Sequence, residues 1–475
     1  MGGAQPRFVR RLRIRAHCPG PAAQYFHGVA ALAGGPEEAC SAPRERTGFR
    51  DQPGQGGGVA ASLAERSVVD LKDIKLYVDD RPEDGAFRVH RDLFADPELF
   101  ELEQKYIFEC TWAFLAFESQ LAKPHDYIAT HIGRVPVMVT RDAAGNLGAF
   151  LNVCRHKGTM LARAESGNRK YHVCNYHGWA YDSGGRNIDV KDRKSACYGA
   201  AFDAEDHDLV PLARFANYKG LLFGSLNADV LALEDYLGEL KFFLDLALEQ
   251  GPRGMECVPG RITYTFDANW KLQMDNGVDQ YHLTSTHTSF MEVVRQREKA
   301  KTGNQAARAF DWDKRLAQDG GSFNFEHGHT AIWLNQAQPE RRQVYASREE
   351  IRKRVGDKRA EWMLKLRNIV VFPNMQIADS TSLLLRTFRP LAVNKTEMRV
   401  YCMAPLGEPP AQRAWRLRQF EDFFNVSGLA TPDDTSVYED SQAGFAAPVS
   451  WLQGYQRGMA ATEPGASALA REIGI

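Results

Sequence analysis

Two short segments of the chain each carry a cysteine and a histidine at a spacing that suits metal ligation. The first reads CRHKG over residues 154–158, and the second reads CNYHGW over residues 174–179, with seventeen residues between His156 and Cys174. Thiolate and imidazole together are donors for zinc, copper and iron–sulfur centres. The four candidate ligands are Cys154, His156, Cys174 and His177.

Two metal groups fit this donor set. One is a tetrahedral zinc ion, and the other is a Rieske [2Fe–2S] cluster, in which two cysteines hold one iron and two histidines hold the other. For a cluster, each segment would give one ligand to each iron, and Gly158 and Gly178 would let the backbone approach the sulfurs. Buried structural residues are a poor explanation because all four recur at a paired spacing. The residues alone leave both metals open.

A second group of metal-ligating residues lies in the segment NWKLQMDNGVDQYHLTSTH, residues 269–287. His282 and His287 are five positions apart, which separates them by about 140° around an ideal helix. Asp279, three positions before His282, shares a helix face with it. Both imidazoles can reach one ion only where the helix is distorted or ends, and the run Leu283–Thr286 is the expected place for a bulge or break.

A third ligand is needed, and the segment TPDDTSVYED, residues 431–440, offers acidic candidates. Two histidines and one carboxylate on one face of Fe(II) form the arrangement of non-haem oxygenases. The same residues also suit a helix start, with Thr431 as N-cap, Pro432 at the first position and Asp433 and Asp434 in the first turn. Spacing alone therefore leaves this carboxylate undecided.

The secondary structure predicted around these residues changes along the chain, from mainly strands to a mixture of strands and helices. Residue patterns predict strands at 127–152, in short runs, and at 171–181, 217–226, 261–267, 368–379, 382–390 and 397–404. They predict helices at 92–110, 233–249, 270–287 and 409–427. A strand-rich part followed by mixed strands and helices predicts an α+β protein, with a small β domain and a larger α+β domain.

Composition narrows the class of protein. The chain has 475 residues, 59 basic and 60 acidic side chains and a net charge of −1, which excludes a wholly disordered chain and the basic field expected of a nucleic-acid binder. No run of about 18 apolar residues predicts a membrane span. Eight cysteines without a secretory signal favour a reducing compartment, so we expect a cytoplasmic protein. Residues 1–60 hold 11 Gly and 6 Pro and are expected to be a disordered extension.

From about residue 65 to 460 the chain resembles the large (α) subunit of Rieske non-haem iron aromatic-ring-hydroxylating dioxygenases. The motifs that carry the resemblance are CRH-x17-CxxHGW, the NWK…DxxYHxxxxH segment and the late PDD. The resemblance implies a Rieske domain at 111–226 and a catalytic domain at 227–460, helix-grip or START-like, with antiparallel sheet and helices. Residues 61–110 would be a helical part of the catalytic domain, and 461–475 a tail.

The resemblance also implies roles for individual residues. Cys154, His156, Cys174 and His177 would bind the [2Fe–2S] cluster. His282, His287 and Asp434 would bind the mononuclear Fe(II), with Asp434 preferred over its neighbour Asp433. Asp279 would link the two metal centres between neighbouring subunits, in keeping with the carboxylate that commonly orients a metal-bound histidine.

The implied function is the terminal oxygenase of a multicomponent system, which adds both atoms of O2 to an aromatic ring as a cis-dihydrodiol. No G-x-G-x-x-G motif opens a βαβ unit, so NAD(P)H would act only through a partner reductase, with or without a ferredoxin. The assembly would be α3 or, with a small β subunit, α3β3. A monohydroxylase or demethylase, a Rieske electron-transfer protein and a zinc-stabilised protein are the alternatives.

The sequence contains weaker indications of the substrate class and of the surface that would bind a redox partner. Only Gly277 and Val278 separate Asn276 from Asp279, a spacing that looks closer to the benzoate and anthranilate branch than to naphthalene-type enzymes. That favours an aromatic carboxylate, for which Arg386 and Arg389 are candidate partners, although outward-facing arginines on a strand are the simpler explanation. Basic residues near the cluster motifs suggest an acidic redox partner. They are Arg155, Lys157, Arg163, Arg169 and Lys170.

Overall fold

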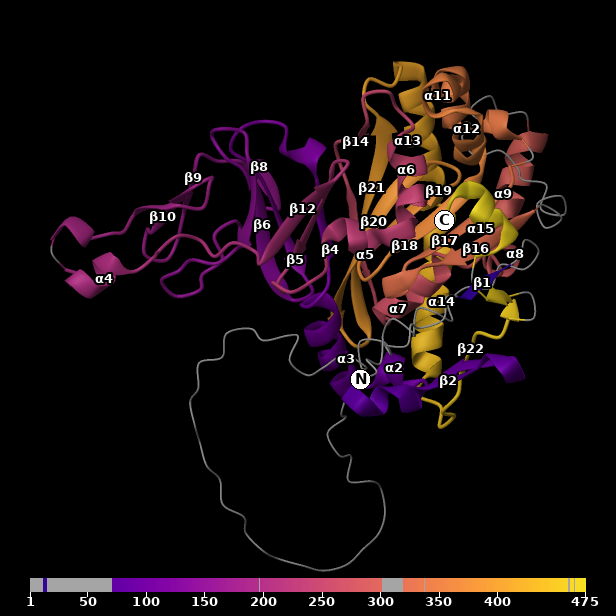
Figure 1. The fold of residues 1–475 in the computed structure, drawn as a ribbon, viewed down its shortest axis with the longest axis horizontal. Coiled ribbons are helices and arrows are strands. Elements are labelled where there is room, and N and C mark those ends of the chain that lie inside the picture. Colours follow the sequence, from indigo (N-terminus) through magenta and orange to yellow (C-terminus); the bar gives the residue numbers. More distant parts are fainter. Residues whose placement is uncertain are drawn as a thin grey trace, which may run out of the picture.

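The computed structural model describes residues 12–14, 71–195, 197–300, 319–336, 338–459, 462–464 and 466–475. Apart from the short strand β1 (Leu12–Ile14), the extension expected at 1–60 lies outside the described residues. Figure 1 shows a small β domain on the left that projects from a larger domain of sheet and helices. In the described part of the chain, no helix is both long and apolar enough to cross a bilayer.

The small β domain, residues 113–225, is built from three antiparallel sheets. Their orders are β7-β6-β5-β8, β12-β13-β4 and β11-β10-β9. The strands are β4 (Ala113–Phe117), β5 (Asp126–Ile132), β6 (Val135–Arg141), β7 (Leu147–Leu151), β8 (Ser166–Asn168), β9 (Tyr171–Val173), β10 (Ala180–Asp182), β11 (Asn187–Asp189), β12 (Arg214–Tyr218) and β13 (Leu221–Ser225). A short helix, α4 (Ala200–Ala204), lies between β11 and β12. The predicted runs at 127–152 are confirmed as β5, β6 and β7.

The larger domain is organised around a ten-stranded antiparallel sheet of order β14-β21-β20-β19-β18-β17-β16-β1-β23, with β15 also paired to β21. Its strands are β14 (Met255–Cys257), β15 (Ile262–Phe266), β16 (Gly320–Asn324), β17 (Thr330–Leu334), β18 (Leu366–Val371), β19 (Met375–Asp379), β20 (Leu383–Ala392), β21 (Lys395–Pro405) and β23 (Thr462–Pro464). Together with the helices, this confirms the predicted α+β class.

Helices cover both faces of this sheet. They are α5 (Leu233–Leu237), α6 (Lys241–Leu248), α7 (Trp270–Asn276), α8 (Leu283–Thr286), α9 (Thr288–Lys299), α11 (Arg348–Val355), α12 (Asp357–Leu364), α13 (Pro410–Phe424), α14 (Thr431–Gly444) and α15 (Ala468–Ile473). Because side chains alternate along a strand, Leu385 of β20 packs in a core with α5, α6 and α12. Its neighbours Leu384 and Phe388 face the other way, toward cores that include α13, α7 and α14.

The segment before the β domain packs on the larger domain. It contains η1 (Leu71–Tyr77), β2 (Val78–Arg81), β3 (Ala86–Val89), α2 (Asp92–Ala95), α3 (Pro97–Glu103) and η3 (Gln104–Phe108). Strands β2 and β3 form a sheet with β22 (Gln453–Gly454) from the far end of the chain. The helix predicted at 92–110 is divided at Asp96, whose side chain caps α3 by accepting a hydrogen bond from the Glu98 N–H at 2.8 Å.

Three predicted strands are hairpins instead. Residues 171–181 contain β9 and most of β10, which pair across the loop 174–179, and the other two hairpins have tight turns. Residues 368–379 form β18 and β19, joined by a turn that contains Pro373 and Asn374, and residues 217–226 form parts of β12 and β13. The second turn uses Lys219 and Gly220, both with positive φ (49° and 90°). The apolar side chains continue through both turns, so periodicity does not mark the reversals. The pairs Lys219-Gly220 and Pro373-Asn374 were the residues that could have indicated a turn in the two segments.

A buried ion pair joins α3 to the helix that leads into the second metal motif. The Lys271 ammonium lies 2.5 Å from the Glu103 carboxylate, and their side chains are 1% and 4% exposed. The Trp270 indole N–H donates to the other Glu103 oxygen at 2.8 Å. Removal of one charge from such a pair leaves the other buried and uncompensated.

We predict that Lys271→Met lowers the free energy of unfolding by about 3–5 kcal/mol, because Glu103 then remains buried without its cation. The double variant Glu103→Gln/Lys271→Met keeps an acceptor for Trp270 and should recover most of this loss. Urea denaturation measures both variants. Equal destabilisation in the single and double variants would contradict the prediction.

Candidate metal centres

The two cysteine–histidine segments form matching loops at the outer end of the β domain. The Gly158 N–H donates to the Cys154 carbonyl at 2.9 Å, and the Gly178 N–H donates to the Cys174 carbonyl at 3.0 Å. Both glycines have positive φ, 70° and 77°, a backbone conformation that glycine adopts without strain. The repeated turn places each cysteine at the start of its loop and each histidine near the tip.

The four side chains of these loops point to a shared site. Cys154 and Cys174 are free thiols, each 3% exposed, while the rings of His156 and His177 lie 4.5 Å apart between centroids and are partly exposed. The Nδ1 atom of His156 is buried and has no hydrogen-bond partner among the described residues. Two inner thiols and two outer imidazoles, one with an unpaired nitrogen, fit a cluster that takes sulfur ligands on one iron and histidine on the other.

Around the second motif, the helix predicted over 270–287 is interrupted. α7 ends at Asn276, α8 covers only Leu283–Thr286, and His282 and His287 occupy its two ends. His287 leaves the helical conformation, with φ −97° and ψ 30°, before α9 begins. The predicted break inside Leu283–Thr286 is wrong, because those residues are helical and the interruptions flank them. The effect on the two imidazoles is nevertheless the expected one, since they turn toward one point.

That point is completed by α14. The Nε2 atoms of His287 and His282 lie 3.2 and 3.7 Å from Oδ1 of Asp434. One donor atom from each of the three residues lies within 4.8 Å of the other two, the spacing of ligands around a single ion. His287 and Asp434 are buried, at 2% and 9% exposure. Two imidazoles and one carboxylate on one side of an ion is the donor set of non-haem Fe(II) oxygenases.

A second carboxylate lies behind each histidine. Asp279 Oδ2 is 3.1 Å from Nδ1 of His282, and Asp433 Oδ2 is 3.4 Å from Nδ1 of His287. Carboxylates in this position fix the orientation of a metal-bound imidazole. The structure thereby separates the two acids that the sequence left open, because Asp434 faces the convergence point and Asp433 faces the far ring nitrogen.

The start of α14 differs from the expected cap. Ala430, not Thr431, is the N-cap, and Thr431 is the first helical residue, whose hydroxyl donates to the Phe424 carbonyl at 3.1 Å. This bond ties α14 to the end of α13. Sequence reasoning also missed a role for Asn276, whose amide donates to Asp434 Oδ1 at 3.2 Å. Its position three residues before Asp279 could have indicated this role.

The electrostatics of the site keep its acids ionised. Burial by itself would raise the pKa of Asp434, but the hydrogen bond and charge of His287 outweigh burial and lower that pKa. Burial likewise opposes ionisation of Asp279, and the hydrogen bond from His282 reverses the effect, so its pKa is also lowered. Carboxylates that stay charged are suited to hold a cation and to accept from imidazole N–H groups.

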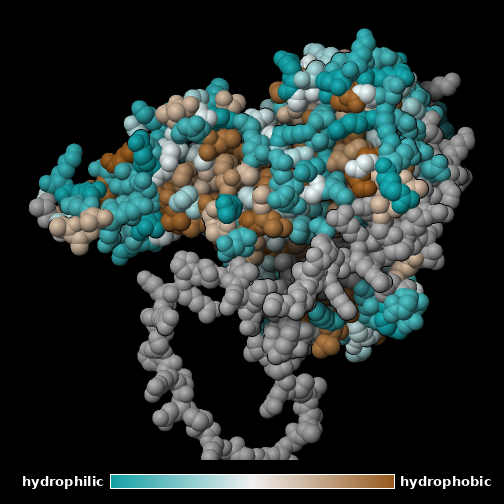
Figure 2. All heavy atoms as spheres, viewed as in Figure 1, coloured by the Kyte–Doolittle hydropathy of each residue, from teal (hydrophilic) through white to brown (hydrophobic). Residues whose placement is uncertain are grey.

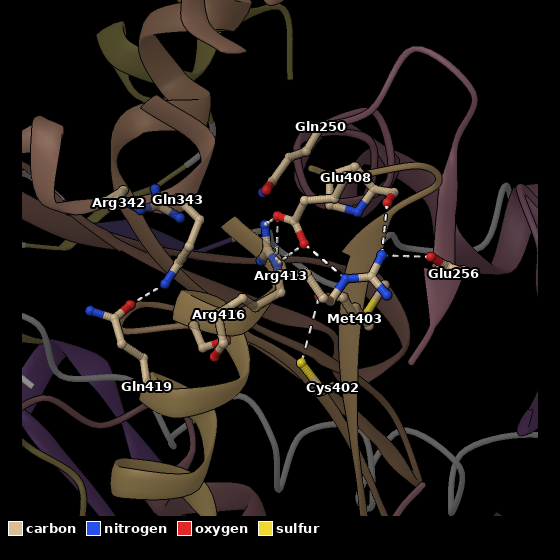
Figure 3. A network of polar contacts seen from close by, with 12 residues as sticks. Gln250, Glu256, Arg342, Gln343, Cys402, Met403, Glu408, Arg413, Arg416 and Gln419 are labelled. Atoms are coloured by element: carbon tan, nitrogen blue, oxygen red, sulfur yellow. Dashed lines mark hydrogen bonds and ion pairs between the residues drawn. The ribbon is translucent and has the colours of Figure 1, made fainter. Parts of the chain in front are cut away.

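The three converging side chains open onto a pocket with aromatic and aliphatic walls. Phe423 and Phe424 come from α13, and Leu283, Leu366 and Ala378 complete the apolar lining. α13 is held by the polar network of Figure 3, in which the Arg416 guanidinium lies 2.6 Å from Glu408 and Arg413 lies 2.6 Å from Glu256. The anchored helix keeps the two phenylalanines in the wall.

The two arginines proposed as carboxylate partners have different surroundings. Arg386 is 8% exposed and lines the pocket together with Asp434. Arg389 lies elsewhere, with its Nε donating to the Gly133 carbonyl of the β domain at 3.3 Å. A description of Arg386 as an outward-facing strand residue is therefore wrong.

Comparisons with known proteins decide the family. The Rieske [2Fe-2S] domain family matches residues 111–203, and the "Ring hydroxylating alpha subunit (catalytic domain)" family matches residues 257–473. The chain is 42% identical over 380 residues to toluate 1,2-dioxygenase subunit alpha of Pseudomonas putida, covering 79% of this chain and 83% of that protein. The chain belongs to the Rieske-type ring-hydroxylating dioxygenase alpha subunits.

Further relatives support the same family and its branch. The large subunit of anthranilate 1,2-dioxygenase from Acinetobacter baylyi is 38% identical, covering 84% of this chain and 86% of that protein. The crystal structure of naphthalene 1,2-dioxygenase from Rhodococcus sp. is 29% identical with a TM-score of 0.65, covering 76% of this chain and 83% of that chain. The resemblance to the benzoate and anthranilate branch is confirmed.

Membership of this family establishes the reaction class and the metal groups of this Rieske dioxygenase subunit. It is an oxidoreductase, the terminal oxygenase of a multicomponent system, which adds O2 to an aromatic ring. A Rieske [2Fe–2S] cluster and a mononuclear iron are its metal groups, and O2 is its co-substrate. The interpretations as a zinc-stabilised protein and as a pure electron carrier are excluded.

The cluster loops and the three converging iron ligands lie in different domains of the subunit. In Figure 1, β9 and β10, which flank the second cluster loop, lie in the left part of the Rieske domain, and α8 lies on the right side of the catalytic domain. In this view, strands of the large sheet lie between β10 and α8.

We predict that Asp434→Ala and His282→Ala lower the iron content from about three to about two Fe per chain while the brown chromophore remains, because only the mononuclear site loses a ligand. Asp433→Ala, the matched control on the neighbouring position, should retain about three Fe after reconstitution, since its carboxylate touches the far nitrogen of His287. Iron analysis and visible spectra check this. Loss of iron in Asp433→Ala alone would reverse the assignment.

Proposed function

We propose that this terminal oxygenase acts on an aromatic carboxylate and adds both atoms of O2 to adjacent ring carbons, giving a cis-dihydrodiol. The observation that carries the proposal is the convergence of His282, His287 and Asp434 at the wall of a pocket lined by Phe423 and Phe424. The carboxylate substrate is supported by the relatives, whose names specify toluate and anthranilate. Both are benzoate-type acids.

Each metal group has its own residues in this proposal. Cys154, His156, Cys174 and His177 hold the [2Fe–2S] cluster, and His282, His287 and Asp434 hold the mononuclear iron. When bound, the cluster supplies electrons one at a time and the mononuclear iron supplies binding and reduction of O2. The protein supplies the ligand geometry and a water-poor pocket around the ring.

The residues next to the iron ligands are positioning residues. Asp279 and Asp433 accept from the Nδ1 side of His282 and His287, so that each Nε2 stays directed at Asp434. The Asn276 amide holds the Asp434 oxygen that faces both imidazoles. This set fixes the direction of the ligands.

The location of the two centres in different domains leads us to propose transfer between subunits. The Asp279 side chain is 23% exposed and lines the pocket that contains the iron ligands. The cluster histidines are likewise partly exposed at the end of the Rieske domain. A neighbouring subunit that brings its cluster histidine to Asp279 would give a short path between the two centres. We propose an α3 ring, with small β subunits in an α3β3 assembly.

Exposed side chains beside the cluster suit such contacts. Tyr171, Val173 and Tyr176 are apolar and 47%, 50% and 63% exposed, and Figure 2 shows hydrophobic side chains among hydrophilic ones on the visible face of this domain. Arg155, Lys157, Arg163, Arg169 and Lys170 are all exposed there. We propose that an acidic reductase or ferredoxin docks near them, and that the enzyme acts in the cytoplasm.

Product analysis under 18O2 tests the substrate and the reaction. The purified holoenzyme with a surrogate reductase is offered benzoate, anthranilate and naphthalene. We expect a cis-diol with two 18O atoms from an aromatic acid. A product with a single 18O atom would instead indicate a monohydroxylase or demethylase, and turnover of naphthalene alone would exclude the carboxylate class.

We predict that Asp279→Asn leaves both metal groups bound after reconstitution but slows electron transfer between subunits by about 10- to 100-fold, because the link to His282 is weakened. Single-turnover kinetics of the reduced enzyme measure this rate. Asp267→Asn, which alters only a surface ion pair with Lys395, is the control. An unchanged single-turnover rate in Asp279→Asn would disprove the role of Asp279.

A further inference from the structure

A buried arginine without a direct ion pair among the described residues lies in the wall of the pocket beside the iron ligands. The Arg386 side chain is 8% exposed, and its Nε atom is buried without a hydrogen-bond partner. Within the described part of the chain, no carboxylate lies within ion-pair distance of it. A buried guanidinium with an unpaired Nε–H is costly unless something else completes its hydrogen bonds.

The other buried arginines of the described chain do have carboxylate partners. Arg342 and Arg367 both contact Asp379. Arg416 lies 2.6 Å from Glu408, as Figure 3 shows, and Arg399 lies 3.0 Å from Glu397. These pairs explain why four arginines are tolerated in the interior. The same explanation does not apply to Arg386.

The strand pattern places Arg386 where an apolar residue is expected. On β20 it shares a face with Leu384 and Phe388, both of which belong to hydrophobic cores. Its guanidinium carbon lies 5.9 Å from the ring centre of Phe424, which lines the same pocket. The cation is therefore held at the aromatic wall of the cavity that contains Asp434.

A second unpaired donor lies in the same wall. The Thr381 hydroxyl is buried without a hydrogen-bond partner, and Thr381 lines the pocket together with Arg386. A planar guanidinium and a hydroxyl match the needs of a carboxylate, which accepts two parallel N–H bonds from arginine and has further lone pairs for an O–H donor. Phe423 and Phe424 provide the apolar surface for an aromatic ring.

We propose that Arg386 is the specificity-determining residue that binds the carboxylate of the substrate, with Thr381 as an accessory donor. This inference rests on the proposed function and assigns its anion-binding site. The bound carboxylate supplies a direct ion pair to Arg386, while the attached ring packs on the phenylalanines beside the three iron ligands. A neutral aromatic ring would not supply this ion pair, so the site would discriminate against it.

The competing explanation is that Arg386 only supports Asp434, whose pKa its positive charge helps to lower. The two explanations predict different effects of an Arg386 variant on charged and neutral substrates. A supporting role affects every substrate alike, whereas a carboxylate contact affects only those that carry the anion. Benzoate and its neutral counterpart benzamide separate them.

The test uses reconstituted Arg386→Gln holoenzyme. Equilibrium dialysis under anaerobic conditions measures the Kd of benzoate, and turnover with a surrogate reductase measures kcat/KM for benzoate and benzamide. We expect benzoate binding, and the benzoate-to-benzamide ratio of kcat/KM, to fall by about 10- to 100-fold, the worth of a charge-assisted pair. Iron content should stay at about three Fe per chain.

Arg389→Gln is the matched control, since it removes the same charge three positions along the same strand, outside the pocket lining. It should leave both substrates unaffected. Arg386→Lys, which keeps the charge but loses the planar fork, should weaken benzoate binding selectively and serves if the Gln variant does not fold.

The possible results distinguish failure of the proposed function from failure of the Arg386 assignment alone. If the wild-type enzyme converts no aromatic carboxylate, the proposed function fails, and the assignment of Arg386 fails with it. If the wild type converts benzoate but the Arg386 variants bind it as tightly, or lose benzoate and benzamide to the same extent, only the assignment of Arg386 is overturned.

Discussion

The convergence of two histidines five positions apart with one carboxylate from a distant helix is the constraint on which the catalytic domain depends. A regular helix would direct the imidazoles about 140° apart. The chain resolves this by ending α7 at Asn276 and placing His282 and His287 at the two ends of the four-residue helix α8. α14 then has to dock so that Asp434 meets both rings, and the Thr431 bond to the end of α13 helps to hold it there.

The residues around the convergence of His282, His287 and Asp434 both orient the histidines and form an apolar wall. On one side, Asp279 and Asp433 hold the far nitrogens of the histidines, and Asp279 remains partly accessible. On the other side, Phe423 and Phe424 keep an apolar wall next to the ligands. One pocket lining therefore contains both the carboxylate that orients His282 and the phenylalanines of the apolar wall. The cluster loops and α8 belong to different domains of one chain, which is the basis of the proposed transfer between subunits.

Much of the architecture follows from local patterns. The paired loops are read directly from their spacing, because each cysteine, histidine and positive-φ glycine belongs to one tight turn. The helices around 92–110 and the strands between 127 and 152 also follow from their periodicity and turn residues. The hairpins at 217–226 and 366–379 were missed because hydrophobic residues continue through their turns. Chain reversal there depends on two residues, too few to change a periodic signal.

The sequence by itself determined the kinds of ligand, the two-centre organisation and the strand-rich and mixed parts, because these depend on residue type and short-range spacing. Only the tertiary structure decided between Asp433 and Asp434, which neighbour each other on α14 and point about 100° apart. It also decided between Arg386 and Arg389 on β20. Which side of a helix or strand meets the pocket is fixed by how that element packs against others far away in the chain, and no local pattern contains that information.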